Sequence, residues 1–211
     1  MSGCQTSPSD APHEVNFCGN MDPIIEPRLS MITPNIWNFS ASGLMSWAAA
    51  YAVWEPISYI IFPMIFRAAT TQEYYNHRKF SFGVVAAGDF LYSTMLLLVA
   101  QQVIGFVFGS AGAPNTWLDW SKRLLTFIGV QWVGDLSFYG LVKSLPAAWT
   151  PRYLDFFKRY GAQVGIGAPI GDSLYGIVWL LLTQWMATNV APWIQTFLIV
   201  TFLFFTLIVS F

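Results

Sequence analysis

Four carboxylic acids stand inside long apolar stretches of this sequence. They are Glu55, Asp89, Asp135 and Asp172, and most of their neighbours are apolar or aromatic. A charged carboxylate at the centre of a bilayer costs roughly 2.5–3.5 kcal/mol on insertion scales. Such acids either form hydrogen bonds that hold helices together or build a path for protons or cations. Both kinds of chemistry remain open from the residues alone.

A tyrosine follows each acid by three or four residues along the chain. Residues at this spacing share one face of a helix, so acid and hydroxyl can point the same way. We therefore predict one intramembrane polar layer in which the acids form hydrogen bonds with tyrosines or with the neighbouring Gln101, Gln131 and Gln184. The tyrosines of this layer are Tyr59, Tyr92, Tyr139 and Tyr175.

The composition indicates that the positioning elements are transmembrane helices. Apolar residues make up 55% of the chain and charged residues only 10%, against about 25% charged residues in a soluble domain. A spanning helix needs roughly 20 apolar residues. The sequence predicts an all-α, polytopic transmembrane helical bundle of about five helices, with a kink at Pro56 and Pro63 in the first. The predicted spans are 42–66, 82–108, 124–145, 164–187 and 193–211.

The motif Gly-Asp-x-Leu-Tyr occurs twice, at 88–92 and at 171–175. Glu55 with Tyr59 likewise resembles Asp135 with Tyr139. The pattern predicts a tandem two-helix repeat whose copies are related by an axis along the membrane normal. Gly88, Gly134 and Gly171 would permit close helix packing. The predicted parts are an N-terminal arm (1–41), repeat 1 (42–108), a connector (109–123), repeat 2 (124–187) and a C-terminal helix (188–211).

Aromatic and basic residues mark the predicted ends of the helices. Tryptophan favours the membrane interface, and basic residues favour cytoplasmic loops. Most of the ten lysines and arginines fall in the loops 67–81 and 143–163, which we expect on the same, cytoplasmic side. The predicted interfacial anchors are Trp37, Trp117, Trp120, Trp149 and Trp193.

Several function classes find little support in the sequence. The chain has two histidines, His13 and His77, so we expect neither a metal site nor a hydrolase triad. Cys4 and Cys18 lie in the polar arm, and the residues leave open whether they pair. With a net charge of −1, binding of nucleic acid is not expected. We predict no enzyme activity and no cofactor.

The paired Gly-Asp-x-Leu-Tyr helices (88–92 and 171–175) and the proline-containing arm resemble small multi-span virion membrane proteins of nucleocytoplasmic large DNA viruses. The resemblance covers about 42–187. It implies a structural protein of a virion inner membrane or host endomembrane, anchoring the bilayer to an overlying protein shell. Capsid or other membrane proteins would then bind 1–41 and 146–163. The alternative from the acids is a proton- or cation-coupled channel or transporter.

Overall fold

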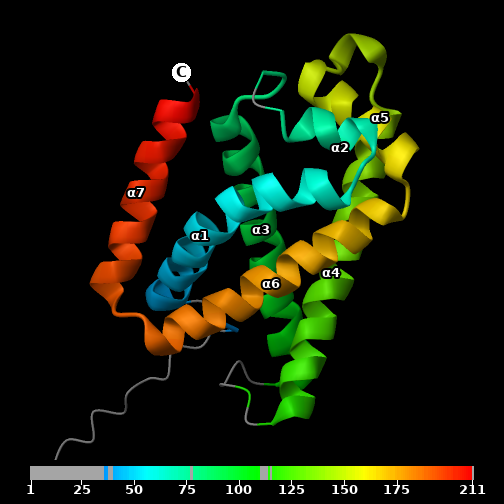
Figure 1. The fold of residues 1–211 in the computed structure, drawn as a ribbon. Helices are drawn as coiled ribbons and strands as arrows, with labels where there is room; N and C mark the ends of the chain where they lie inside the picture. The colour runs from blue at the N-terminus through cyan, green and yellow to red at the C-terminus, as the bar shows by residue number, and fades with distance from the viewer. Residues whose placement is uncertain (1–35, 38–39, 77, 110–113, 115, 211) are drawn as a thin grey trace, which may run out of the picture. The chain divides into compact units, whose positions relative to one another are not determined.

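The computed structural model describes residues 36–37, 40–76, 78–109, 114 and 116–210. This part of the chain is helical and contains no strand, so the predicted all-α class is confirmed. The predicted arm lies almost wholly outside the described residues. Figure 1 shows the elements in order: α1 (Ala41–Ile65), α2 (Ala69–Tyr74), α3 (Phe82–Phe108), α4 (Trp117–Ser144), the 3₁₀ turn η1 (Ala147–Trp149), α5 (Arg152–Val164), α6 (Gly167–Asn189) and α7 (Pro192–Ser210).

The long helices identify a multi-pass integral membrane protein. Within the described residues, α1, α3, α4 and α7 are each long and apolar enough to cross a bilayer. Helices α5 and α6 meet at a bend of 103° and supply a fifth span if the pair counts as one. Large apolar side chains such as Phe106, which is 92% exposed, cover the outside of the bundle. Lipid is the environment in which such a surface is stable.

Three predicted spans agree with α1, α3 and α7 to within one residue at both ends. The span 164–187 is shifted by two to three residues in α6, and the largest difference is at the start of α4. This helix begins at Trp117, inside the segment predicted as a connector. The Thr116 hydroxyl caps it by accepting a hydrogen bond from the Asp119 N–H at 3.1 Å. Asp119 then pairs with Arg123 at 3.2 Å. Charged residues in the first turns lowered the hydropathy there and hid a helix that capping stabilises.

The bend predicted in α1 is present. Figure 1 shows α1 changing direction between its blue and cyan portions, and the helix contains Pro56 and Pro63. Proline removes a backbone hydrogen bond and its ring clashes with the preceding turn. At the end of α1, the Gln72 side-chain amide donates to the carbonyl oxygens of Pro63 and Phe66, which have no donor within the helix because it ends there.

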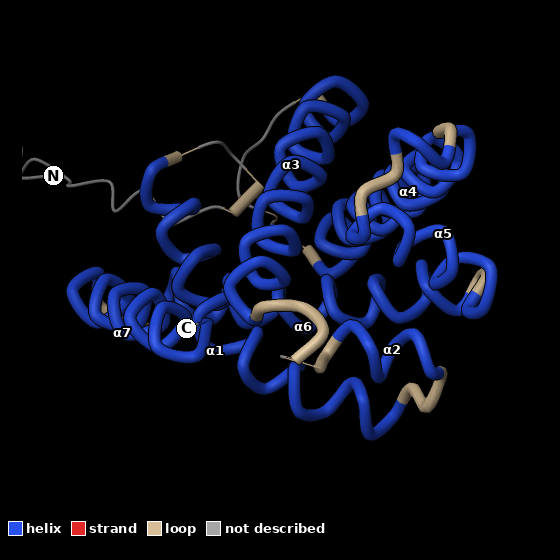
Figure 2. Tube along the Cα trace, turned by 90° about the horizontal axis from the view of Figure 1, so that it is seen from above, coloured by secondary structure: helices blue, strands red, loops and turns tan. Residues whose placement is uncertain are grey.

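The two repeats have the same order of elements: a long helix, a short helix and a second long helix. They pack crosswise, because α1 lies on α6 while α4 lies on α3, and the short helices α2 and α5 contact each other. A two-fold relation between the predicted copies would produce this exchange of partners. Helix α7, outside the repeat, packs on α1 and α3. In Figure 2 it lies on one side of the bundle, with α4 and α5 on the other.

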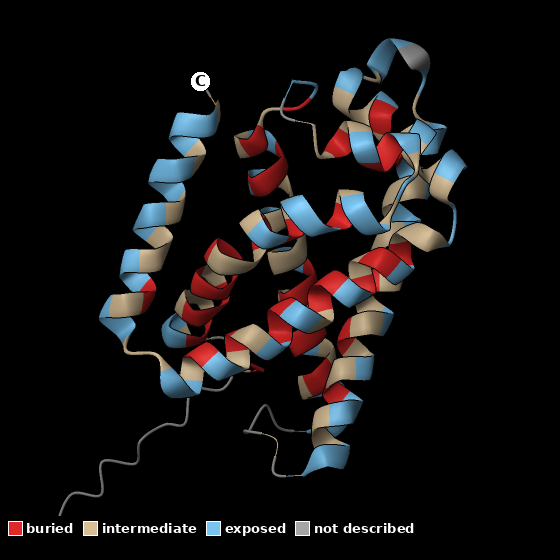
Figure 3. Cartoon of the chain, viewed as in Figure 1, coloured by how far each residue is buried: buried red, intermediate tan, exposed pale blue. Residues whose placement is uncertain are grey.

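An aromatic core joins the two repeats. The rings of Trp47 in α1 and Trp179 in α6 stack with centroids 3.7 Å apart. The Trp179 indole N–H also donates to the Trp47 carbonyl oxygen at 2.9 Å. Figure 3 shows buried residues concentrated where α1, α3 and α6 meet, whereas α7 is largely exposed. This packing fixes the crosswise arrangement of the long helices.

Candidate functional site

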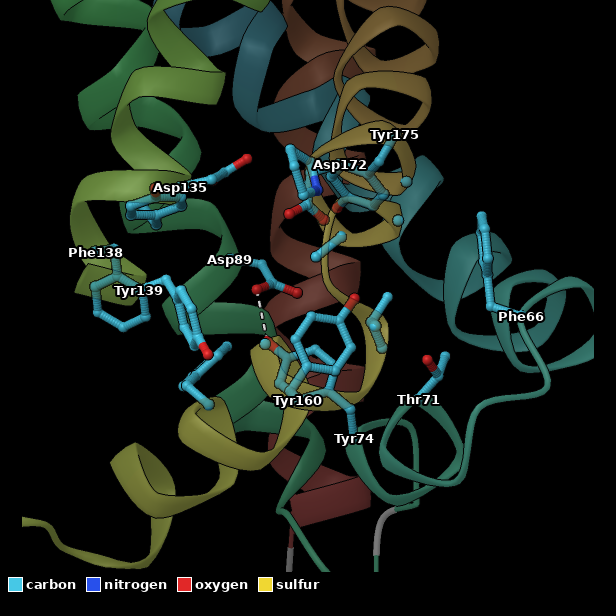
Figure 4. Close-up of a pocket in the computed structure, with 18 of the residues that line it drawn as sticks. Phe66, Thr71, Tyr74, Asp89, Asp135, Phe138, Tyr139, Tyr160, Asp172 and Tyr175 are labelled. Atoms are coloured by element: carbon cyan, nitrogen blue, oxygen red, sulfur yellow. Dashed lines mark hydrogen bonds between the residues drawn. The ribbon is translucent and has the colours of Figure 1, made fainter. Parts of the chain in front are cut away.

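A cavity of about 540 Å³ lies between α1–α2–α3 and α4–α5–α6, next to the α2–α5 contact. Three of the four predicted acids line it, namely Asp89, Asp135 and Asp172. They come from α3, α4 and α6, and Figure 4 shows them around one space. About half of the other wall residues are aromatic: Phe62, Phe66, Tyr74, Tyr75, Tyr92, Phe138, Tyr139, Tyr153, Phe156, Phe157, Tyr160 and Tyr175.

Two acids bind tyrosines from the other repeat. The Tyr175 hydroxyl in α6 donates to Glu55 in α1 at 2.6 Å, and the Tyr92 hydroxyl in α3 donates to Asp135 in α4 at 2.9 Å. Both tyrosines end a Gly-Asp-x-Leu-Tyr motif, and both acids occupy matching repeat positions. The same bond is therefore made twice, as the two-fold relation requires.

The hydrogen bonds that Tyr59 and Tyr139 were expected to donate to the acids are not formed. The Tyr59 hydroxyl has no hydrogen-bond partner, and its ring packs edge-on against Tyr75 and Phe82. Tyr139 lines the cavity, but no hydrogen bond joins it to a carboxyl in the described chain. Spacing along one helix places acid and tyrosine on one face, yet the bond is made by whichever hydroxyl the neighbouring helix brings closer.

Glu55 is separated from the other three acids. Its side chain is 0% exposed, and the Ser58 hydroxyl adds a bond to the same carboxyl oxygen at 3.3 Å. Glu55 does not line the cavity, whereas its partner Tyr175 does. The predicted single polar layer is therefore divided into three cavity acids and one acid sealed behind a tyrosine.

Asp89 has a partner that the sequence pattern missed. The Tyr74 hydroxyl in α2 donates to Asp89 at 2.7 Å. Tyr74 lies in a loop by hydropathy, 15 positions before the acid, so helical spacing does not point to it. The repeat of Glu73-Tyr74-Tyr75 as Asp155-Phe156-Phe157 was the available signal, because it places an aromatic pair over each Gly-Asp motif.

Asp172 differs from Asp89 although the two occupy the same repeat position. No group in the described chain donates a hydrogen bond to its carboxyl. The residue that corresponds to Tyr74 in the second repeat is Phe156, which also lines the cavity and stacks on Tyr74 with ring centroids 5.3 Å apart. Phenylalanine has no hydroxyl. The second repeat thus presents a carboxyl to the cavity without the donor that the first repeat supplies.

Basic residues lie beside the cavity and not in its wall, which contains neither lysine nor arginine. Arg159 of α5 forms an ion pair with Glu73 of α2 at 2.8 Å and a second with Asp155 at 3.3 Å. The bond from Arg159 lowers the pKa of Glu73. This bridge joins the two basic loops, so their predicted location on the same side of the bundle is confirmed.

The three predicted packing glycines have different surroundings. A Cβ on Gly134 would lie 2.6 Å from the end of the Leu96 side chain of α3, so any larger residue there requires that side chain to shift. On Gly88 it would meet the Tyr153 hydroxyl at 3.0 Å, and on Gly171 it would find ordinary contact with Phe66 at 3.6 Å. Gly171 is therefore not required for packing.

The predicted tryptophan anchors fall into two groups. Trp117, Trp149 and Trp193 are 72–87% exposed and lie at or near helix ends, as expected of interfacial residues. Trp37 was predicted wrongly, because it is fully buried and packs edge-on against Trp120 at 6.1 Å. The position of a tryptophan in the sequence does not show whether another indole will bury it in the fold.

Metal-binding geometry is not found among the described residues, where no three His, Cys, Asp or Glu side chains are grouped to hold an ion. The three cavity acids face one space without converging on a point. His13, His77, Cys4 and Cys18 lie outside the described chain.

Comparison with known proteins gives one partial similarity. A stretch of 52 residues is 38% identical to the heme A synthase of Paracoccus denitrificans. The match covers 24% of this chain and spans 14% of the synthase. No protein-family model matches the chain, and no solved structure matches it.

Proposed function

We propose that this integral membrane protein binds a cation in the cavity between its two repeats and carries it across the bilayer. The observation that supports the proposal is the wall itself, where carboxyls from three helices face one space that contains no lysine or arginine. Acids inside a membrane protein that face an internal cavity mark ion or substrate pathways.

The repeat favours transport over a purely cohesive role, in which the acids only hold helices together by hydrogen bonds. Transporters built from repeats bind their substrates at the repeat interface, which is where Asp89, Asp135 and Asp172 lie. Glu55 fits the cohesive role, since it is sealed and bonded to Tyr175 across the interface. A cohesive role alone gives no reason for an acid such as Asp172 to face a cavity without a donor.

The test is transport by the full-length chain reconstituted in liposomes. Uptake of protons, potassium and radiolabelled methylammonium would be compared with protein-free vesicles. We expect uptake of at least one of these cations to exceed that control. It should fall by roughly tenfold or more in Asp89→Asn and Asp172→Asn, since a charge-assisted hydrogen bond is worth a tenfold change or more in binding.

Asp119→Asn is the matched control. It removes the same charge from α4 at a site outside the cavity, where Asp119 pairs with Arg123. Transport by this variant should equal that of the unmodified protein. Uptake indistinguishable from that of empty vesicles for all three cations, or uptake insensitive to both cavity substitutions, would refute the proposal.

The role predicted from the viral resemblance, anchoring of a bilayer to a protein shell, stays a prediction. Most of the arm 1–41 lies outside the described residues. In the 146–163 segment, Phe156, Phe157 and Tyr160 already line the cavity, which leaves its outer face, including Trp149, for a partner. The prediction that the chain is not an enzyme also remains, because the heme A synthase match is too short to transfer an activity.

A further inference from the structure

We infer that the cavity takes a protonated amine with an apolar body, and that Asp172 holds its ammonium group. This rests on the proposed function and names its substrate class. The inference starts from an asymmetry between the repeats. Asp89 receives a hydrogen bond from Tyr74, whereas Asp172 receives none, and Phe156, at the repeat position of Tyr74, has no hydroxyl to give.

Two buried side-chain atoms of the wall lack a hydrogen-bond partner, and both are acceptors: one carboxyl oxygen of Asp135 and the side-chain oxygen of Gln131. The carboxyl of Asp172 adds two more acceptor oxygens to the same wall. Gln131 is 94% buried, with 6% of its surface exposed, and it lines the cavity. Buried polar atoms without partners are costly and uncommon in native proteins. A ligand with several N–H donors satisfies them, and a quaternary ammonium ion does not.

The aromatic wall selects for positive charge and for an apolar body together. The faces of phenylalanine and tyrosine rings attract ammonium groups, more strongly where water is excluded. Tyr160 and Phe157 of α5 line the cavity together with Phe62 and Phe66 at the end of α1, so the wall offers apolar surface besides the carboxyls. A cavity of about 540 Å³ falls in the range of sites for small organic molecules.

An inorganic ion fits the same wall less well. A metal ion bound by protein oxygens needs several ligands converging at roughly 2.0–2.6 Å, and the described acids form no such group. Potassium or sodium would also have to give up hydration to a wall rich in aromatic carbon. An amine retains three donors at one end and buries its carbon at the other.

The experiment measures binding of three matched probes to the full chain in lipid nanodiscs by calorimetry. The probes are 2-phenylethylamine, its N,N,N-trimethyl derivative and 2-phenylethanol, with empty nanodiscs correcting for partition into lipid. We expect the amine to bind roughly tenfold to a hundredfold more tightly than either other probe, the range that a charge-assisted hydrogen bond supplies.

Two substitutions test the assigned carboxyl. Asp172→Asn should weaken amine binding by the same factor, while Asp119→Asn should leave it unchanged. Phe156→Tyr adds, at the matching position of the second repeat, the hydroxyl that Tyr74 gives to Asp89. We expect this hydroxyl to bind Asp172 and so to weaken amine binding as well. Thermal unfolding checks that each variant is folded. If Phe156→Tyr does not fold, Asp172→Asn and the comparison of the three probes still test whether Asp172 binds the ammonium group.

Each outcome separates this inference from the proposed function. Equal affinity for the amine and its trimethyl derivative would overturn the requirement for donors. Absence of amine binding, with proton or potassium transport that still depends on Asp172, would overturn the substrate class and leave the proposed function standing. Absence of binding together with absence of transport would overturn both.

Discussion

Replacement of Tyr175 by phenylalanine tests the crosswise bonding of the repeats most directly. The substitution removes one hydroxyl and leaves the ring, whose packing against Trp54 and Trp179 is retained. The lost donor bonds Glu55 at 2.6 Å. Glu55 is fully buried, one of its carboxyl oxygens already lacks a partner, and Ser58 lies 3.3 Å from the other.

The expected loss of unfolding free energy is about 1–2 kcal/mol. Leaving a buried polar group without its partner costs roughly 1–3 kcal/mol, and hydrogen bonds in membrane proteins reach at most about 1.7 kcal/mol in double-mutant cycles. The matched variant is Tyr92→Phe, which removes the equivalent bond to Asp135. Because Asp135 lines the cavity, water can replace the hydroxyl there, and we expect a loss below about 1 kcal/mol.

The assay is reversible unfolding in mixed micelles with increasing denaturing detergent, followed by tryptophan fluorescence. A double-mutant cycle that combines Tyr175→Phe with Glu55→Gln isolates the pair from the rest of the core. The reasoning is refuted if the coupling energy is below about 0.3 kcal/mol, the additivity error of such cycles. It is also refuted if Tyr92→Phe destabilises the protein more than Tyr175→Phe.

Two further substitutions test the bridge between the loops and the contact of α3 with α4. Arg159 lowers the pKa of Glu73 below 4.5, so the pair stabilises the fold above that pH and loses its effect as pH falls through the lowered pKa. Thermal unfolding should therefore show the Glu73→Gln variant about 0.2–1 kcal/mol less stable than the unmodified protein at neutral pH. At a pH below the lowered pKa of Glu73 the two proteins should be equally stable. A difference in stability that does not change with pH would contradict this. Gly134→Ala places a methyl group against Leu96 and should cost about 1–3 kcal/mol, whereas Gly129→Ala on the same helix meets nothing within 4 Å and should be neutral or stabilising. Equal melting temperatures for the two alanine variants would show that α3 and α4 are not closely packed there.

The sequence by itself determined the class of protein, most of the spans and the duplication. These properties are local or periodic. A run of apolar residues defines a span wherever it lies, and a repeated Gly-Asp-x-Leu-Tyr is visible without coordinates. The limit of that signal is seen at the start of α4, where Asp119, Lys122 and Arg123 lower the hydropathy of a helix that a cap and an ion pair stabilise. Helix α2 was likewise taken for part of a loop.

The tertiary structure decided which hydroxyl meets which carboxyl. A helix places Tyr59 and Glu55 on neighbouring positions of one face, but the crosswise packing of α1 on α6 brings Tyr175 to Glu55 instead. The same packing seals Glu55 and leaves Asp172 facing a cavity without a donor. Bond formation depends on the separation of groups far apart in the chain, and that separation is set only when the two repeats pack against each other.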